Sequence, residues 1–155
     1  MSHLSQDNHW MTIAIAEAKL AGVEGDVPVG CVLVKENVIL AQGHNIKEQT
    51  QDPTDHAEIV VIRKATAAQK SWRLNDCTLY TTLEPCPMCA EVIIQARVSR
   101  LVFGAYDPKS GAIGSMVNLF IPGRIYPIPE VTAGIAEEEC KKLLVNFFRN
   151  KGNDR

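Results

Sequence analysis

A strand, a helix and a second strand follow one another closely in the middle of the chain, and this alternation limits the possible folds more than any other feature. The sequence predicts a strand over Cys77 to Leu83, a helix over Pro87 to Val98 and a strand over Arg100 to Ala105. A connection of this length that contains a helix favours a parallel crossover. We therefore expect an α/β protein.

The remaining segments predict a mixed sheet with helices on both faces. β-Branched apolar runs over Val27 to Val34 and Val38 to Gln42 flank the polar turn Lys35-Glu36-Asn37, which is the pattern of an antiparallel hairpin. The segment 108–129 is rich in Gly and Pro and predicts no regular element. Three further helices are expected over residues 7–21, with Asp7 as the N-cap, 56–70 and 135–150.

Length and composition describe one ordinary soluble domain. The 155 residues contain no repeat and no Gly/Ser linker, so a single domain over residues 1–155 is expected. The chain is 46% hydrophobic and 22% charged, which argues against disorder. A formal net charge of −2 excludes a generally basic nucleic-acid coat.

The chain shows no sign of membrane insertion or export. No apolar run approaches the roughly 18 residues of a transmembrane helix, and the first residues lack the basic and apolar stretches of a secretory signal. Five cysteines are an odd number in a chain too long to need disulfide staples. We therefore expect a cytoplasmic protein with reduced thiols, without membrane association.

Two short segments at predicted helix starts carry the chemistry. In Pro85-Cys86-Pro87-Met88-Cys89, two cysteines three residues apart lie on one face of a helix N-terminus, where both sulfurs reach one ion. The positive end of the helix dipole favours the thiolate form that binds zinc. A neutral imidazole from His56, in His56-Ala57-Glu58, supplies a third ligand.

The number of ligands indicates a catalytic rather than a structural site. A closed structural zinc site has four protein ligands, whereas a catalytic site leaves one position to water. Only three ligands stand together, because the other cysteines and histidines of the chain are scattered. Glu58, in the first turn after His56, is the candidate general acid/base of a hydrolytic deamination.

Each of these motifs has a simpler interpretation when it is taken alone. An isolated C-x-x-C next to a βαβ pattern also fits a thioredoxin-like redox pair, and a zinc site without catalysis is a further alternative. A lone His-x-Glu is usually the start of a surface helix. The joint occurrence of both motifs in this order, with Pro85 before Cys86, favours the catalytic metal site.

The combined pattern H-x-E…P-C-x-x-C resembles the signature of the zinc-dependent nucleobase deaminases. Within that superfamily of cytidine and deoxycytidylate deaminases, the chain resembles the bacterial tRNA-specific adenosine deaminases over nearly its whole length. The residues that carry this closer resemblance are 26–30, 52–54, 82–89, 103–105, Asp107 with Gly111-Ala112, and Phe147-Phe148-Arg149.

The resemblance implies a cytidine-deaminase-like, three-layer α/β/α fold with a mixed five-stranded sheet, and a homodimer that acts on a tRNA anticodon stem-loop. The implied reaction converts the wobble adenosine to inosine. His56, Cys86 and Cys89 would hold one Zn²⁺ per subunit, and Glu58 would move protons. The implied substrate-binding residues are Asn45, Val27, Pro28, Val29, Ala57, Asp107, Phe148 and Arg149.

Several positions depart from the family pattern or have a second interpretation. Ile125-Tyr126-Pro127 and Tyr106 replace residues that are often His, Asn, Arg or Gln, and the ring of Tyr106 is suited to stacking on a splayed base. Asp107 also fits a plain turn residue before Pro108. Segments 43–45 and 74–80 resemble guanine deaminases, so a free nucleobase or nucleoside deaminase of guanine or cytosine type is the alternative function.

Overall fold

The computed structural model describes residues 3–151 and confirms the α/β class. Its five-stranded sheet has the strand order β2-β1-β3-β4-β5. β1 pairs antiparallel with β2 and β3, whereas β4 pairs parallel with β3 and β5, so the sheet is mixed as predicted. The strands are β1 (Gly30–Lys35), β2 (Val38–His44), β3 (Thr78–Leu83), β4 (Arg100–Ala105) and β5 (Glu130–Ala133).

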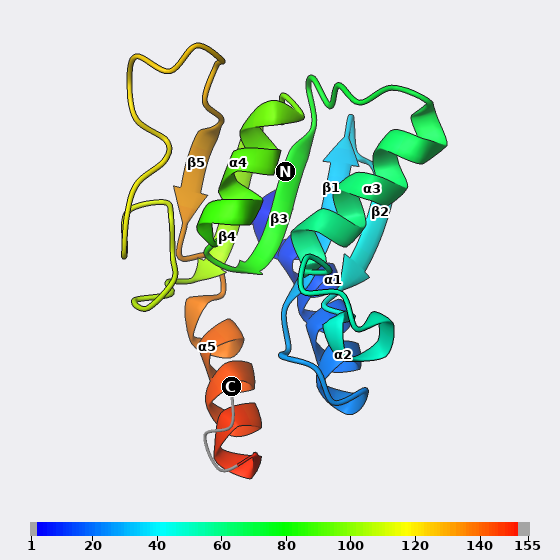
Figure 1. Ribbon diagram of the computed structural model, residues 1–155, viewed down its shortest axis with the longest axis vertical. Helices are drawn as coiled ribbons and strands as arrows, with labels where there is room; N and C mark the ends of the chain where they lie inside the picture. The colour runs from blue at the N-terminus through cyan, green and yellow to red at the C-terminus, as the bar shows by residue number, and fades with distance from the viewer. Residues whose placement is uncertain (1–2, 152–155) are drawn as a thin grey trace.

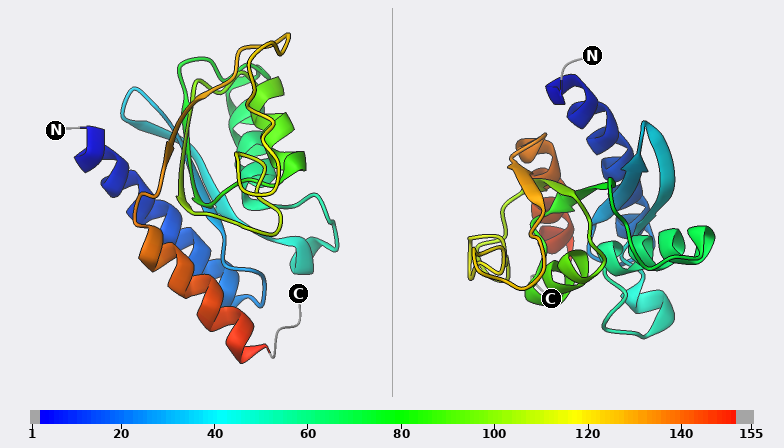
Figure 2. Two further views of the ribbon diagram at one scale, coloured as in Figure 1. Left: turned by 90° about the vertical axis from the view of Figure 1, so that its left-hand side faces the viewer. Right: turned by 90° about the horizontal axis from the view of Figure 1, so that it is seen from above.

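Helices cover both faces of this sheet and give the predicted three layers (Figures 1 and 2). α1 and α5 lie side by side on one face, and α3 and α4 lie on the other. One apolar cluster, which includes Leu79 and Ile93, lies under α3 and α4, and a second, which includes Met11 and Val102, lies under α1 and α5. The helices are α1 (His3–Val23), α2 (Lys47–Thr50), α3 (Ala57–Gln69), α4 (Pro87–Gln95) and α5 (Glu137–Asn150).

The predicted hairpin and crossover are both present. Glu36 and Asn37 form the hairpin turn with φ angles of 51° and 62°, the left-handed geometry whose twist matches the flanking strands. The first strand begins at Gly30 rather than at Val27, because α1 packs directly on the backbone there. A Cβ atom at Gly30 would lie only 2.1 Å from the carbonyl oxygen of Ala14. Residues 27–29 therefore form an irregular segment before the strand.

The prediction that Asp7 caps the first helix is wrong. α1 begins at His3, and Asp7 lies inside it with only 2% of its surface exposed. Both carboxylate oxygens of Asp7 accept hydrogen bonds from the Arg100 guanidinium, at 2.8 and 2.7 Å, and the Tyr80 hydroxyl donates a third at 2.9 Å. Burial alone would raise the pKa of Asp7, but these hydrogen bonds outweigh it and lower the pKa. This ion pair joins α1 to β3 and β4.

Replacing Asp7 by asparagine is expected to lower the free energy of unfolding by about 3 kcal/mol, because Arg100, whose side chain is only 14% exposed, would lose its counter-charge. Urea unfolding at pH 7 measures this. Because the folded-state pKa of Asp7 is lowered, its contribution is present above the unfolded-state pKa of about 3.9 and is lost as the pH falls through the folded value. The difference between the two proteins should therefore shrink at low pH, and a constant difference would contradict the assignment.

The long segment between β4 and β5 contains no helix and only the isolated bridge between Ile113 and Asn118. It leads into β5, a strand of four residues that the sequence pattern alone did not locate. Because β5 is short and its side chains are exposed or only half-buried, the sequence shows no alternation of apolar and polar residues there. Among residues 3–151, no helix is long and apolar enough to cross a membrane.

Candidate metal centre and adjoining cavities

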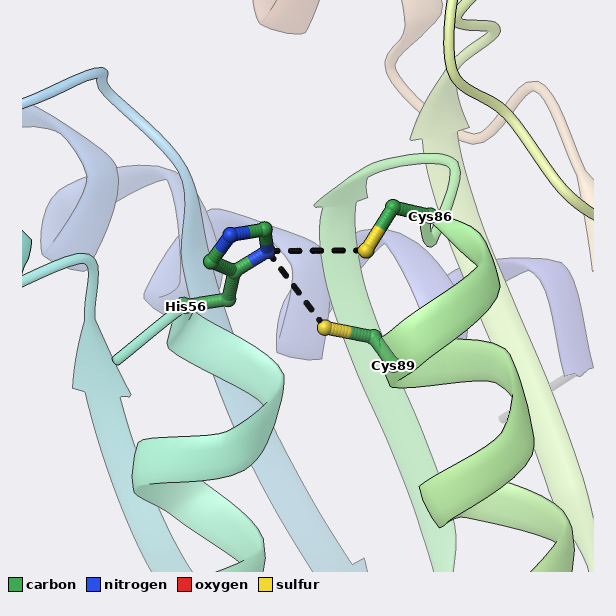
Figure 3. A group of neighbouring side chains, drawn as sticks. All are labelled: His56, Cys86 and Cys89. Carbon is green, nitrogen blue, oxygen red and sulfur yellow. Dashed lines mark hydrogen bonds between the residues drawn. The ribbon is translucent and has the colours of Figure 1, made fainter. Parts of the chain in front are cut away.

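Three predicted ligands converge where α3 and α4 begin. His56 is the N-cap residue of α3, Cys86 is the N-cap residue of α4, and Cys89 lies in the first turn of α4. His56 Nδ1 lies 3.6 Å from Cys86 Sγ and 3.5 Å from Cys89 Sγ (Figure 3). Because α3 and α4 pack side by side on one face of the sheet, residues 30 positions apart meet at their N-terminal ends.

The distances fit a tetrahedral zinc ion. Zinc–sulfur bonds of about 2.3 Å and zinc–nitrogen bonds of about 2.0–2.1 Å at tetrahedral angles place sulfur and nitrogen ligands about 3.6 Å apart. All three ligand atoms lie within 4.8 Å of one another, and no fourth ligand joins them among the described residues. The donor set of two thiols and one imidazole therefore fits a zinc ion that keeps one position for a non-protein ligand.

The electrostatics of the two thiols differ. A hydrogen bond from the Cys89 thiol, with a further one from His56, lowers the pKa of Cys86 to about 4 against the effect of burial. The pKa of Cys89 is raised, because its thiol donates that hydrogen bond and is itself buried. A thiolate at Cys86 is the form that binds metal.

Glu58 lies beside this trio in a small cavity. The cavity has a volume of about 180 Å³ and is lined by His56, Cys86 and Glu58, among others. Glu58 is 4% exposed, and burial raises its pKa to about 7 although the nearby His56 opposes the shift. The structure therefore places the candidate acid/base and two of the candidate ligands around one small cavity.

Asn45 and two of the valines complete the walls of this cavity, which is called the inner cavity below. The Asn45 side chain donates a hydrogen bond to the Val27 carbonyl oxygen (3.1 Å) and accepts one from the Ala57 backbone N–H (2.7 Å). It thus ties the loop that carries Val27 and Val29 to the start of α3. Pro28 and Ala57 are buried but do not line the cavity, so the structure does not bring these two predicted residues to it.

A larger groove of about 810 Å³ adjoins the inner cavity and is called the outer groove below. Phe148 and Arg149 of α5 line it, which places both predicted residues on its wall. Asp107 lines both the groove and the inner cavity. One Asp107 oxygen accepts hydrogen bonds from the Lys109 and Ser110 backbone N–H groups (3.1 and 3.2 Å), so the turn interpretation of Asp107 is also correct.

Glu84 is a buried acid that lines the inner cavity and was not among the predicted site residues. Its carboxylate accepts hydrogen bonds from the backbone N–H groups of Asp107, Ile113 and Ser115, at 3.0 to 3.1 Å. A Cβ atom at Gly111 would lie 2.4 Å from the Glu84 carboxyl carbon, so only glycine fits where the loop crosses this side chain. Glu84 therefore holds the loop that presents Asp107. Its position directly before the Pro-Cys motif was the available signal.

Replacing Glu84 by glutamine is expected to loosen residues 107–115, because an amide NH₂ would face backbone donors in place of a carboxylate oxygen. Hydrogen–deuterium exchange of peptides from this segment should rise by about 10- to 100-fold, as expected for the loss of one or two hydrogen bonds to a charged group. Glu91→Gln is the matched control. Glu91 pairs with Arg124, which lies in the same segment between β4 and β5, and neither residue lines a cavity. Equal exchange in both variants would refute this role of Glu84.

The sequence comparison agrees with this geometry. The family described as the cytidine and deoxycytidylate deaminase zinc-binding region matches residues 4–105, which include all three candidate ligands and Glu58. The chain belongs to this deaminase family. Zinc is accordingly the metal of the site, as predicted. Membership in the family, with His56 Nδ1 at the distance from both sulfurs that ligands of one metal ion would have, favours the metal site over a redox pair.

Curated relatives within the family are similar over almost the entire deaminase chain. The tRNA-specific adenosine deaminase of Bacillus subtilis is 47% identical over 146 residues, covering 94% of this chain and 91% of that protein. The enzyme of the same name from Agrobacterium fabrum is 43% identical over 151 residues, covering 97% and 99%.

A solved structure supports the fold and the grouping. It comes from a study of A-to-I editing by tRNA:A34 deaminases at the wobble position, and it superposes with a TM-score of 0.85 at 44% identity. The match covers 88% of this chain and 99% of that one. The predicted cytidine-deaminase-like fold is therefore confirmed.

The two departures from the family pattern lie in different places. Tyr126 packs under the Arg97 guanidinium, 4.0 Å from the ring centroid, just beyond the C-terminal end of α4 and away from both cavities. Tyr106 lines the outer groove. Of these two aromatic residues, only Tyr106 is positioned to touch a molecule bound there.

Proposed function

We propose that this deaminase hydrolyses the adenine amine of a tRNA, converting adenosine to inosine at the wobble position of the anticodon. The observation that carries the proposal is the pair of adjoining cavities: a small one beside the metal ligands and Glu58, which opens to a large groove. A deaminase acting on a base within a strand needs this layout, because the target base is flipped into a pocket while the strand stays outside. The names and near-complete coverage of the relatives support the same substrate class.

In this proposal the three metal ligands and four residues that line the inner cavity, Glu58, Asn45, Val27 and Val29, have defined tasks. His56, Cys86 and Cys89 hold the zinc ion, which supplies an activated water molecule when bound. Glu58 accepts a proton from that water, delivers it to the ring nitrogen next to the reacting carbon, and then assists departure of the amine as ammonia. Asn45, Val27 and Val29 hold the base, and the oxygen of water replaces the exocyclic nitrogen.

The outer groove receives the anticodon stem-loop under the same proposal. Arg149 contributes a positive charge for backbone phosphates and Phe148 an aromatic ring, and both line the groove. Asp107 uses only one carboxylate oxygen for its turn, so the other is available to a ribose 2′-OH at the boundary of the two cavities. A carboxylate at this position favours RNA over DNA.

We also propose a homodimer of single-domain chains, each spanning residues 1–155, in the cytoplasm. The support for a dimer is a set of large apolar side chains that remain exposed in the segment between β4 and β5 and in β5 itself, where association would bury them. These are Met116, Val117, Ile121, Ile125, Ile128 and Val131. Sedimentation of the protein, with Ile125→Asp as the disruptive variant, tests the dimer.

The substrate is tested by incubating the zinc-loaded protein with an adenosine-bearing anticodon stem-loop and, separately, with guanine, cytosine and free adenosine. Ammonia release and the inosine content of the RNA are measured. Inosine in the RNA alone is the expected result. Turnover of a free base with the RNA unchanged would instead establish the free-nucleobase deaminase as the function.

A further inference from the structure

His44, the last residue of β2, lies between two carboxylates. Its Nδ1 lies 2.6 Å from Glu17 Oε1, and its Nε2 lies 2.9 Å from Glu24 Oε1. The side chains of His44 and Glu17 are 14% and 12% exposed, whereas that of Glu24 is 46% exposed. Glu17 belongs to α1 and Glu24 directly follows that helix, so the ring joins this end of α1 to the sheet. None of the three residues lines the inner cavity or the outer groove, so they act on a bound molecule only through other residues.

The two hydrogen bonds of His44 require the protonated ring. A carboxylate only accepts hydrogen bonds, and a neutral imidazole has one N–H, so the neutral ring can serve one of the two carboxylates. The imidazolium has two N–H groups and serves both. Burial alone would lower the pKa of His44, but the hydrogen bonds to Glu17 and Glu24 outweigh it and raise the pKa. His44 therefore keeps its charge to a higher pH than an ordinary histidine does.

The other charged groups on the elements around His44 lie elsewhere or have partners of their own. Lys64 of α3 lies beside Gly43, on the opposite face of β2, where its ammonium donates to the Gln42 carbonyl oxygen. β1 places Gly30 opposite His44 and its charged residue at the far end. The remaining titratable residues of α1 and of the segment after it are the exposed His3, His9 and Lys19, Asp7, which pairs with Arg100, and Asp26, whose carboxylate accepts backbone N–H groups. Glu17 and Glu24 are therefore the charges that control the protonation of His44.

His44 and Asn45 are consecutive, and together they hold the connection between α1 and β1, residues 24–29. His44 holds the start of this connection at Glu24. Asn45 holds it further along, because its side chain donates a hydrogen bond to the Val27 carbonyl oxygen (3.1 Å). Val27 and Asn45 both line the inner cavity. A change at His44 therefore reaches the wall of that cavity through a single residue on either side.

We propose that His44 is a positioning residue for the base-binding wall of the inner cavity and that it acts in its protonated form. The imidazolium keeps the connection 24–29 in the place where Val27 and Asn45 receive the base. When the ring loses its proton, it releases Glu24, because that half-exposed carboxylate can be solvated by water. Binding of the substrate then weakens, while Glu58 and the metal ligands stay in place. This inference rests on the proposed base-binding role of Val27 and Asn45.

The first test compares KM for the stem-loop between the wild type and His44→Gln as the pH is raised. At low pH the variant should have a KM higher by at least about 5-fold, the lower end of couplings between linked sites, with kcat nearly unchanged. Because the pKa of His44 is raised, its contribution is present at low pH and is lost as the pH rises through the folded-state pKa. The two KM values should therefore converge at high pH. Glu58, whose pKa is about 7, titrates in both proteins and cancels from their ratio.

An NMR titration of the His44 ring, assigned by its absence from His44→Gln, ties this ratio to one group. The measured pKa should lie above the ordinary value of about 6.5, and the KM ratio should change with the same midpoint. Glu24→Gln changes only the half-exposed partner and leaves Glu17 in place, so it should keep the fold, lower the pKa of His44 and raise KM at low pH. His9→Gln is the matched control. His9 is an exposed histidine of α1 that lines neither cavity, so this variant should follow the wild type at every pH.

Hydrogen–deuterium exchange of the ligand-free protein tests the positioning without any substrate. At low pH, peptides that cover residues 24–29 should exchange at least about 5-fold faster in His44→Gln than in the wild type. Equal exchange, a His44 pKa at or below the ordinary value, or a KM ratio that is the same at every pH would overturn the proposal. A wild type that deaminates a free base but not the stem-loop would instead refute the proposed function. The KM ratio is then measured with that base, which enters the same inner cavity.

Discussion

Glu58→Ala is expected to lower kcat for deamination by about 10²- to 10⁴-fold, the range for losing a positioned proton carrier. The zinc content and the fold should be retained. The physical reason is geometric: Glu58 lines the inner cavity with His56 and Cys86 but is not one of the three convergent ligand residues. Single-turnover inosine formation, metal analysis and thermal unfolding of the same preparation measure the three properties together.

Glu58→Gln separates proton transfer from packing. Glutamine keeps the shape of the side chain in a site that is 4% exposed, but it cannot accept and release a proton at neutral pH. It should therefore be as inactive as Glu58→Ala and at least as stable. Glu138→Ala, at an exposed acid on α5, serves as the control for loss of a negative charge. Turnover near the wild-type rate in Glu58→Gln with zinc in place would show that another group moves the protons.

Local patterns were sufficient to predict the chemistry of the site because its ligands lie at helix starts. The Cys-x-x-Cys spacing and the Pro at the first helical position define one helix face without knowledge of the tertiary structure. His56 and Glu58 lie two residues apart at the start of α3, so their relation was also local. Only the proximity of His56 to the two cysteines depends on the tertiary structure. That proximity was inferred because all three side chains are suitable ligands for one metal ion.

Residues whose role depends on distant partners were not predictable in the same way. Asp7 has the residue type and place of an N-cap, and only its partner Arg100, 93 positions away, shows that it lies inside α1. Glu84 looks like an ordinary acid before a motif, whereas its carboxylate holds backbone groups 23 to 31 residues further on. β5 is too short and too exposed to show a period. The periodicity of apolar residues indicates which face of a helix or strand is buried, but it does not identify partners that are distant in the sequence.

Cys86→Ala is expected to reduce bound zinc from one ion per chain to nearly none after dialysis against a weak chelator, and to abolish deamination. A site with three protein ligands has no spare donor, since the other cysteines and histidines of the described chain do not join the trio. Alanine removes one of the two sulfur atoms whose distance from His56 Nδ1 fits zinc ligation. This is also the thiol whose pKa is lowered, so the favoured thiolate ligand is removed with it. Metal analysis together with the inosine assay measures both effects.

Cys77→Ala is the matched control for this prediction, because Cys77 is a free, buried cysteine directly before β3, at the opposite end of that strand from Cys86, and belongs to no metal cluster of the described residues. It loses a buried sulfur without losing a ligand, so its zinc content and activity should follow the wild type even if its stability falls. Cys86 is only half-buried, so its truncation should leave the fold intact. Stoichiometric zinc in folded Cys86→Ala protein would show that Cys86 is not a zinc ligand. A reversible Cys86–Cys89 disulfide in wild-type protein that keeps full deaminase activity without zinc would instead support the thiol redox interpretation.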